Sequence, residues 1–386
     1  MPKKKIAIFF PYFIKGGSDV VVAQTIEALK NKYEVTLITF DKYEKINRFS
    51  EFYGAHFSKE DISIVNPPFS FLLRKIPGFG LFKYHLSVRY FKSSNMNFDV
   101  VLGLYKEIDF GRKGIQYIHV PELDIKDQES NSSTIKYYQN YFWGKIYKYF
   151  CYFTSGFNKE QMKKNITLVN SVWTKNIVKK SLGTESRVVY PPVSDNFPNI
   201  PFDEKENGFL CLGRIFPGKE TDKIIRIIKK VRQNNIEVHL HIIGVSDDLN
   251  YIRFIKKLCS ENSSWCFFEG EISGQKKLEF IAKHKYGILG CKNEAFGIAV
   301  AEMAKAGCIV FVPDGGGQTE IINNSQLIYK DEKDAVQKII NVLSNKNLQY
   351  SLQNHLFQRA NLFSTERFIK DIKEITKNAL IENALK

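Results

Sequence analysis

The sequence contains no unbroken apolar run of about 18 residues, so it offers no candidate for a transmembrane helix. It also lacks the excess of polar residues that keeps a chain disordered, since 44% of its 386 residues are hydrophobic and 25% are charged. The length exceeds that of one ordinary domain of about 100–200 residues. We therefore expect a folded protein with two domains.

Cysteine is scarce, and none of the six cysteines stands in the Cys-x-x-Cys spacing of zinc sites and redox motifs. Several of them lie in apolar runs that resemble strands. This pattern indicates reduced thiols in a cytoplasmic protein, and it gives no sign of a zinc site.

Acidic residues are few beside basic ones, which gives a net charge of +15. The excess is uneven, because residues 1–200 carry a net charge of +11 and the remainder +4. A basic surface attracts nucleic acid, an anionic membrane or a phosphorylated substrate. A general richness in lysine, without any acidic partner, would give the same composition.

Strands and helices alternate along both halves of the sequence. A strand at 5–10, a loop with Gly16-Gly17, a helix at 19–31 and a strand at 34–40 follow one another, which is the order of a parallel α/β sheet. Further strands are predicted at 99–104, 114–119, 166–170, 187–190, 208–213, 239–244, 265–269, 286–290, 308–312 and 326–329.

This pattern predicts an α/β protein of two Rossmann-like, doubly wound domains that face each other across a cleft. Ligands of such sheets bind at the carboxyl ends of the strands. The proline-rich joint near 191–206 separates a first domain at 1–195 from a second at 196–364. A last helix, 365–386, is expected to pack back on the first domain.

The strongest chemical signal is the segment from Asn293 to Glu302, which follows a predicted strand. Phe296-Gly297-Ile298 would open a helix whose free N–H groups suit a phosphate or a sugar hydroxyl. A loop position for Glu294 and a helical position for Glu302 would let both carboxylates face one ligand. A capped helix with two solvated glutamates is the alternative interpretation.

Three further segments end or follow predicted strands. Gly213-Arg214-Ile215-Phe216-Pro217-Gly218-Lys219 supplies two cations, and Arg214 with Lys219 could hold a diphosphate without a metal. Tyr117-Ile118-His119 places a histidine at the cleft, although a lone histidine is more often structural. Pro313-Asp314-Gly315-Gly316-Gly317-Gln318-Thr319-Glu320 has three glycines in a row, which permit either close ligand approach or a plain turn.

Together these segments resemble the family-four retaining glycosyltransferases of the GT-B fold. The pairing of His119-Val120-Pro121 with Asn293 to Gly297 is similar to the lipid-linked oligosaccharide mannosyltransferases of that family. The resemblance spans nearly the whole chain, and further matching segments are Gly16-Gly17, Asn170 to Thr174, Val189 to Val193 and Phe363 to Phe368.

The resemblance implies a role for each matching residue. Glu294 would bind hydroxyls of the donor sugar, Glu302 the ribose, and Arg214 with Lys219 the diphosphate. Backbone amides of Phe296, Gly297 and Ile298 would complete the sugar or phosphate site. His119 would contact the donor sugar, and Gly16 with Gly17 would let the first loop approach the phosphate.

The implied reaction is transfer of a hexose from GDP-mannose or a UDP-hexose, with retained configuration, to a glycan or lipid-linked acceptor. No Asp-x-Asp element stands where it could hold a metal, so we expect neither a metal nor a cofactor. Three alternatives remain open at this point: an NAD-dependent oxidoreductase, which would lack the usual Gly-x-Gly-x-x-Gly order, a GT-B sugar-nucleotide epimerase, and a nucleic-acid-binding protein. Nucleic acid is not the expected partner, because no recognised binding motif is present.

Two stretches, 67–92 and 135–157, mix aromatic and basic residues. Such mixtures suit a membrane interface, or a buried helix whose lysines reach outward. We expect the first stretch to attach the protein peripherally to the cytoplasmic face of an anionic membrane, where it would reach a lipid-linked acceptor.

Overall fold

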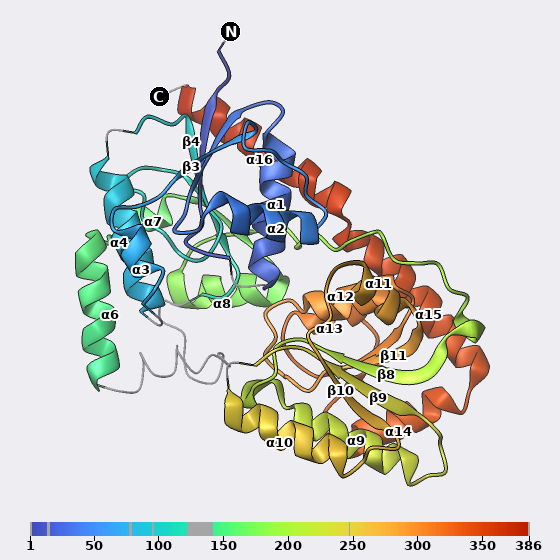
Figure 1. Cartoon of the computed structure of the whole chain (residues 1–386). Helices are drawn as coiled ribbons and strands as arrows, with labels where there is room; N and C mark the ends of the chain where they lie inside the picture. Colours follow the sequence, from blue (N-terminus) through green and yellow to red (C-terminus); the bar gives the residue numbers. More distant parts are fainter. Residues whose placement is uncertain are drawn as a thin grey trace. The chain divides into compact units, whose positions relative to one another are not determined.

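The computed structural model describes residues 2–13, 16–76, 79–94, 96–121, 142–246 and 248–384, and the chain divides into two compact units (Figure 1). Unit 1 comprises Met1–Pro192 together with Thr365–Lys386, and unit 2 is Val193–Ser364. Each unit is built on one parallel sheet. The predicted fold class of two doubly wound α/β domains is thereby confirmed.

The sheet of unit 1 has seven parallel strands in the order β3-β2-β1-β4-β5-β6-β7. They are β1 Lys5–Phe9, β2 Glu34–Ile38, β3 Ile62–Val65, β4 Val100–Gly103, β5 Ile115–Ile118, β6 Ile166–Val169 and β7 Arg187–Val188. The edge strand β3 was not predicted, because its four residues include the polar Ser63 and follow a polar turn.

Helices cover both faces of this sheet. Alternate residues of β1 enter different clusters, with Ile6 and Ile8 in one and Ala7 and Phe9 in the other. The helices are α1 Gly17–Leu29, α2 Tyr43–Phe52, α3 Ser70–Leu73, α4 Gly80–Ser93, α6 Phe142–Ser155, α7 Lys159–Lys163, α8 Val172–Leu182 and α16 Thr365–Ala384.

The last helix belongs to the core of unit 1. Phe368, Ile372, Ile375 and Ala379 recur at helical spacing on one face of α16, and they pack in the same cluster as residues of α1 and β1. None of the helices within the described ranges has the length and apolar character needed to span a bilayer.

The sheet of unit 2 has six parallel strands in the order β10-β9-β8-β11-β12-β13. They are β8 Glu206–Leu212, β9 His239–Ile243, β10 Cys266–Gly270, β11 His284–Ile288, β12 Ile309–Pro313 and β13 Ile328–Tyr329. The helices are α9 Thr221–Arg232, α10 Leu249–Ser260, α11 Gly274–Ala282, α12 Ile298–Lys305, α13 Gln318–Ile322, α14 Glu332–Leu343 and α15 Lys346–Ala360, with 3-10 turns at Phe202–Glu204, Pro217–Lys219 and Asn361–Phe363.

Glycines let the loops at the carboxyl ends of these strands approach one another. A β-carbon on Gly290, after β11, would lie 2.6 Å from the carbonyl oxygen of Glu220, in the loop after β8. A β-carbon on Gly316, after β12, would lie 2.4 Å from the carbonyl oxygen of Glu294. The Gly317 N–H donates to that same oxygen at 2.7 Å. The backbone around Glu294 is therefore held by the loop after β12.

We predict that Gly316→Ala destabilises unit 2 more than Gly274→Ala does. Both glycines have positive φ, +73° and +60°, so each alanine carries a left-handed strain of about 1–2 kcal/mol. Only at Gly316 would the new methyl group meet backbone, which adds about 1–3 kcal/mol because backbone cannot yield easily. Denaturant unfolding measures both changes, and equal losses for the two variants would contradict the proposed close packing.

Candidate active site

The cationic segment predicted to bind a diphosphate forms the loop between β8 and α9. Gly213 leaves the strand at φ +140°, a conformation that side chains rarely adopt. Arg214 follows it with an exposed side chain, and its guanidinium lies 5.5 Å from the centre of the Phe216 ring. The loop then turns through Pro217–Lys219 into α9. The guanidinium is thus presented beside the strand end and is accessible to a ligand.

Lys219 and Glu294 form an ion pair between the loops after β8 and β11. Both side chains are about three-quarters buried. Burial disfavours the charged form of Lys219, but the Glu294 carboxylate and its hydrogen bond outweigh it and raise the pKa of the lysine. The ammonium therefore stays protonated at neutral pH. The structure thus joins two residues that the sequence placed at one ligand.

The segment Phe296-Gly297-Ile298 opens α12, as predicted. Gly297 caps the helix at φ +99°, and its carbonyl oxygen accepts the N–H groups of Val300 and Ala301. Phe296 is buried and meets the ring of Phe363 edge to face at 5.4 Å. The first N–H groups of a helix have no acceptor within it, and the positive end of its dipole lies there, so this end of α12 suits an anion or a hydroxyl oxygen.

Glu302 lies inside α12, one turn beyond its start, and its partner was not foreseen. Lys277 of α11 donates to both carboxylate oxygens at 2.7 Å. A carboxylate has about four acceptor positions, so this lysine leaves room for hydroxyl groups of a ligand. The sequence held no signal for Lys277, which is one of two adjacent lysines in α11.

Gln318 lies in the predicted glycine segment after β12, although no role of its own was predicted for it. Its side chain is fully buried, and its amide nitrogen donates to the carbonyl oxygens of Cys291 at 2.7 Å and Gly315 at 3.2 Å. These bonds join the loop after β11 to the loop after β12. Gln318 therefore helps to fix the backbone from which the Glu294 side chain projects.

Three predicted residues lie in unit 1. His119 follows β5, and burial lowers the pKa of its imidazole to about 4, although a hydrogen bond to the Leu104 backbone acts in the opposite direction. Its Nε2 atom has no hydrogen-bond partner among the described residues. Gly16 and Gly17 stand at the amino end of α1. That these three approach a ligand held by unit 2 stays a prediction.

Comparison with known proteins finds a family profile that matches most of unit 2. Residues 193–359 match the sequence profile of the glycosyl transferases group 1. The chain is similar in fold to the crystal structure of Anabaena Alr3699/HepE in complex with UDP and glucose, with a TM-score of 0.69 at 12% identity over 97% of this chain and 100% of that one. This likeness shows the fold.

Two curated relatives are enzymes of glycan assembly. The GPI3 subunit of phosphatidylinositol N-acetylglucosaminyltransferase from Saccharomyces cerevisiae is 25% identical over 212 residues, which cover 50% of this chain and 46% of that protein. The GDP-Man:Man(3)GlcNAc(2)-PP-Dol alpha-1,2-mannosyltransferase of Candida albicans is 25% identical over 200 residues, 46% of this chain and 32% of that protein. The matches thus span less than half the length of these relatives. The resemblance drawn from the sequence is confirmed: the chain has the GT-B fold, is similar to lipid-linked mannosyltransferases, and carries a group 1 glycosyl transferase domain in its second unit.

Proposed function

We propose that this protein transfers a hexose from a nucleotide-diphosphate sugar to a glycan or lipid-linked acceptor, with retention of configuration and without a metal. The observation that carries the proposal is the Lys219–Glu294 ion pair beside the amino end of α12. At this place Lys219 could bind the diphosphate and Glu294 the sugar, and the N–H groups at the start of α12 lie beside them. The named donor of the Candida albicans relative is GDP-mannose, and the HepE structure holds UDP and glucose, so both donor classes fit the proposal.

The proposed chemistry follows from charge. Cleavage of the sugar–phosphate bond leaves negative charge on the departing diphosphate. Arg214 and Lys219 would stabilise that charge together with the N–H groups of α12, since preorganised donors act most strongly where charge develops. Glu294 would accept hydroxyl groups of the sugar, and Glu302 those of the ribose. The leaving phosphate would assist attack by the acceptor on the same face of the sugar.

We predict that Glu294→Ala lowers the transfer rate about 100-fold or more while unit 2 stays folded. Removing one preorganised polar group from an active site costs about 2.7–4 kcal/mol of transition-state stabilisation. The backbone bond from the Gly317 N–H to the carbonyl oxygen of residue 294 remains in the variant. Turnover of a nucleotide sugar and thermal unfolding are the measurements. Glu279→Ala, which removes an exposed carboxylate from α11, is the control, and near-normal turnover by a folded Glu294→Ala protein would refute the role.

Arg214→Gln should weaken binding of a nucleoside diphosphate about 10- to 100-fold, because a hydrogen bond to a charged group contributes about 1.5–3 kcal/mol. Binding of the nucleoside with the same base should hardly change. Calorimetric titration of both ligands tests this difference. Lys229→Gln removes an exposed cation of α9 and serves as the control. Equal losses for nucleoside and nucleoside diphosphate would mean that Arg214 does not face the diphosphate.

A lipid-linked acceptor is favoured by an exposed aromatic surface on unit 1. The outward face of α6 has an apolar stripe at helical spacing. Its members are Phe142, Trp143, Ile146, Tyr149, Phe150 and Phe153, of which Trp143 and Phe153 are 72% and 73% exposed. The acceptor of the Candida albicans relative is named as a dolichol-linked oligosaccharide.

The stretch 67–92, which was predicted to contact the membrane, uses most of its cations inside unit 1. In the stretch 67–92, Arg74, Lys83 and Arg89 donate to backbone carbonyl groups, and Lys92 donates to Asp109. These cations are engaged within unit 1. The stretch 135–157 exposes the larger aromatic area through α6, and its residues 135–141 lie outside the described ranges. We therefore assign the main membrane contact to α6, with Phe82 of α4 stacked on Phe150 at 5.9 Å as its support.

We predict that the protein floats with anionic vesicles at low salt and is released at high salt, because surface attraction fades within a Debye length of about 8 Å at physiological salt. Trp143→Ser combined with Phe153→Ser should weaken binding at least tenfold. Burial of about 100 Å² of each ring contributes about 2.5 kcal/mol. Leu249→Ser, on an exposed position of α10 in unit 2, should float like the wild type. If the wild-type protein does not bind anionic vesicles at low salt, the membrane proposal is wrong. The proposal of hexose transfer would not be affected by that result.

A further inference from the structure

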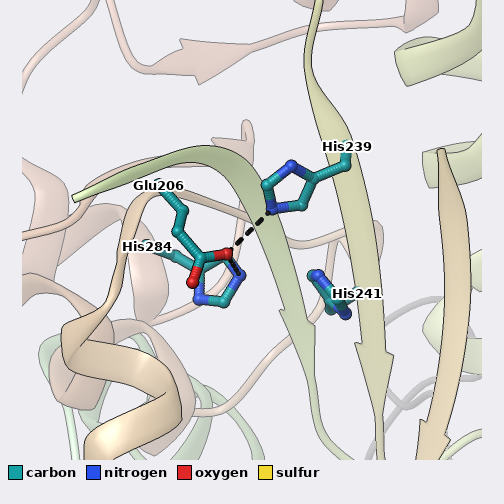
Figure 2. A group of neighbouring side chains, drawn as sticks. All are labelled: Glu206, His239, His241 and His284. Atoms are coloured by element: carbon teal, nitrogen blue, oxygen red, sulfur yellow. Dashed lines mark ion pairs between the residues drawn. The ribbon is translucent and has the colours of Figure 1, made fainter.

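Four potential metal ligands converge at the amino ends of three neighbouring strands of unit 2. Glu206 is the first residue of β8 and His284 is the first of β11. His239 and His241 are the first and third residues of β9. Figure 2 shows the four side chains as neighbours, with the carboxylate of Glu206 between His239 and His284. One ligand atom from each lies within 4.8 Å of those from the other three. The active-site residues follow the carboxyl ends of these strands, about 20 Å away along β8.

The strand register builds this cluster. Glu206 pairs with His284 on one side of β8, and Gly208 pairs with His239 on the other. His239 and His241 are two residues apart, so they project from the same face of β9. A β-carbon on Gly208 would lie 1.9 Å from the Nε2 atom of His239. The absence of that atom lets the imidazole lie over β8 and approach Glu206.

The distances suit a shared ion better than hydrogen bonds. Oε2 of Glu206 lies 3.6 Å from Nε2 of His239 and 3.5 Å from Nε2 of His284. Hydrogen bonds of this kind are about 2.7–3.2 Å long. Nitrogen and oxygen ligands lie about 2.0–2.2 Å from Zn²⁺ in a tetrahedral site, so two ligand atoms on one ion are about 3.4 Å apart. The two Glu206–histidine separations are close to that edge length.

The histidine nitrogens that face the cluster lack other partners. Within the part of the chain that the structure describes, the Nε2 atoms of His239 and His284 have no hydrogen-bond partner, although His284 is only 1% exposed. The Nδ1 atom of His284 donates to the Phe280 carbonyl oxygen at 2.7 Å. This bond fixes the tautomer whose Nε2 carries a lone pair, as a metal requires.

His241 has the outer partner that metal-ligating histidines usually have. Its Nδ1 atom lies 2.7 Å from Oε1 of Glu269, on the neighbouring strand β10. A carboxylate in this position orients the ring and makes its other nitrogen a better ligand. Its Nε2 is then the ring nitrogen that remains for an ion. Glu206 is about half exposed, which gives an ion a path from solvent.

From this geometry we propose that Glu206, His239, His241 and His284 bind one Zn²⁺ ion. Imidazole nitrogen with one carboxylate oxygen is a donor set that Zn²⁺ accepts, and four protein ligands leave no position open for a substrate. The ion is therefore structural. It ties together the amino ends of β9, β8 and β11, and it takes no part in the transfer reaction. A cluster of stacked rings around Phe280 without an ion is the alternative that the experiment must exclude.

The test uses the full chain without a histidine tag. Elemental analysis after dialysis against micromolar free Zn²⁺ should find about one zinc per chain. Addition of Zn²⁺ at about 100 times its dissociation constant to the metal-free protein should raise Tm by about 5 °C or more. Co²⁺ in place of Zn²⁺ should give the intense visible absorption of a tetrahedral site.

Variants on exposed positions keep the test independent of core packing. Glu206→Gln should weaken zinc affinity at least tenfold, and Glu269→Gln about 10- to 100-fold as the loss of an outer partner. Glu237→Gln, an exposed neighbour outside the cluster, should bind zinc like the wild type. Zinc content far below one per chain at saturation, a weak octahedral cobalt spectrum, or equal affinities for Glu206→Gln and Glu237→Gln would each overturn the proposal.

Discussion

Close approach of backbone at the carboxyl ends of β8, β11 and β12 is the constraint on which the candidate active site depends. Gly290 and Gly316 stand where any β-carbon would meet a neighbouring main chain. Gln318 then joins two of the loops through its buried amide. Since the loops cannot separate without losing these contacts, the side chains that they carry have little freedom. Rigid support of this kind is what a site needs to hold reacting groups in a productive geometry.

Charge is arranged in pairs within this frame. Glu294 is matched by Lys219, and Glu302 by Lys277. Each pair satisfies partly buried charges before a ligand arrives, and a buried charge without a partner would be costly. Arg214 differs, because it lies exposed over the Phe216 ring. A ligand with two phosphates would thus meet one accessible cation and a second cation that is already shared with a carboxylate.

The sequence predicted most of the fold because parallel strands buried on both faces are continuous apolar runs separated by helical periodicity. It missed β3, where Ser63 interrupts a strand of four residues. It placed Glu294 in a loop and Glu302 in a helix because Gly297 marks the boundary between them. Lys277 could not be found, since its pairing depends on how α11 lies beside α12. The cluster of histidines was missed as well. The absence of Cys-x-x-Cys argues only against sites with thiolate ligands, whereas the histidines of β9 and β11 are brought together by the strand register.

The chain leaves unit 1 after Pro192 and returns to it only at Thr365, with α16. On the ribosome, the 172 residues of unit 2 must therefore be made before Phe368 and Ile372 can reach the core of unit 1. At about 5–20 residues per second this interval is roughly 10–30 s. Throughout it, the apolar side of α1 that α16 later covers lacks that cover. The nascent protein must thus complete its second domain while its first is still unfinished.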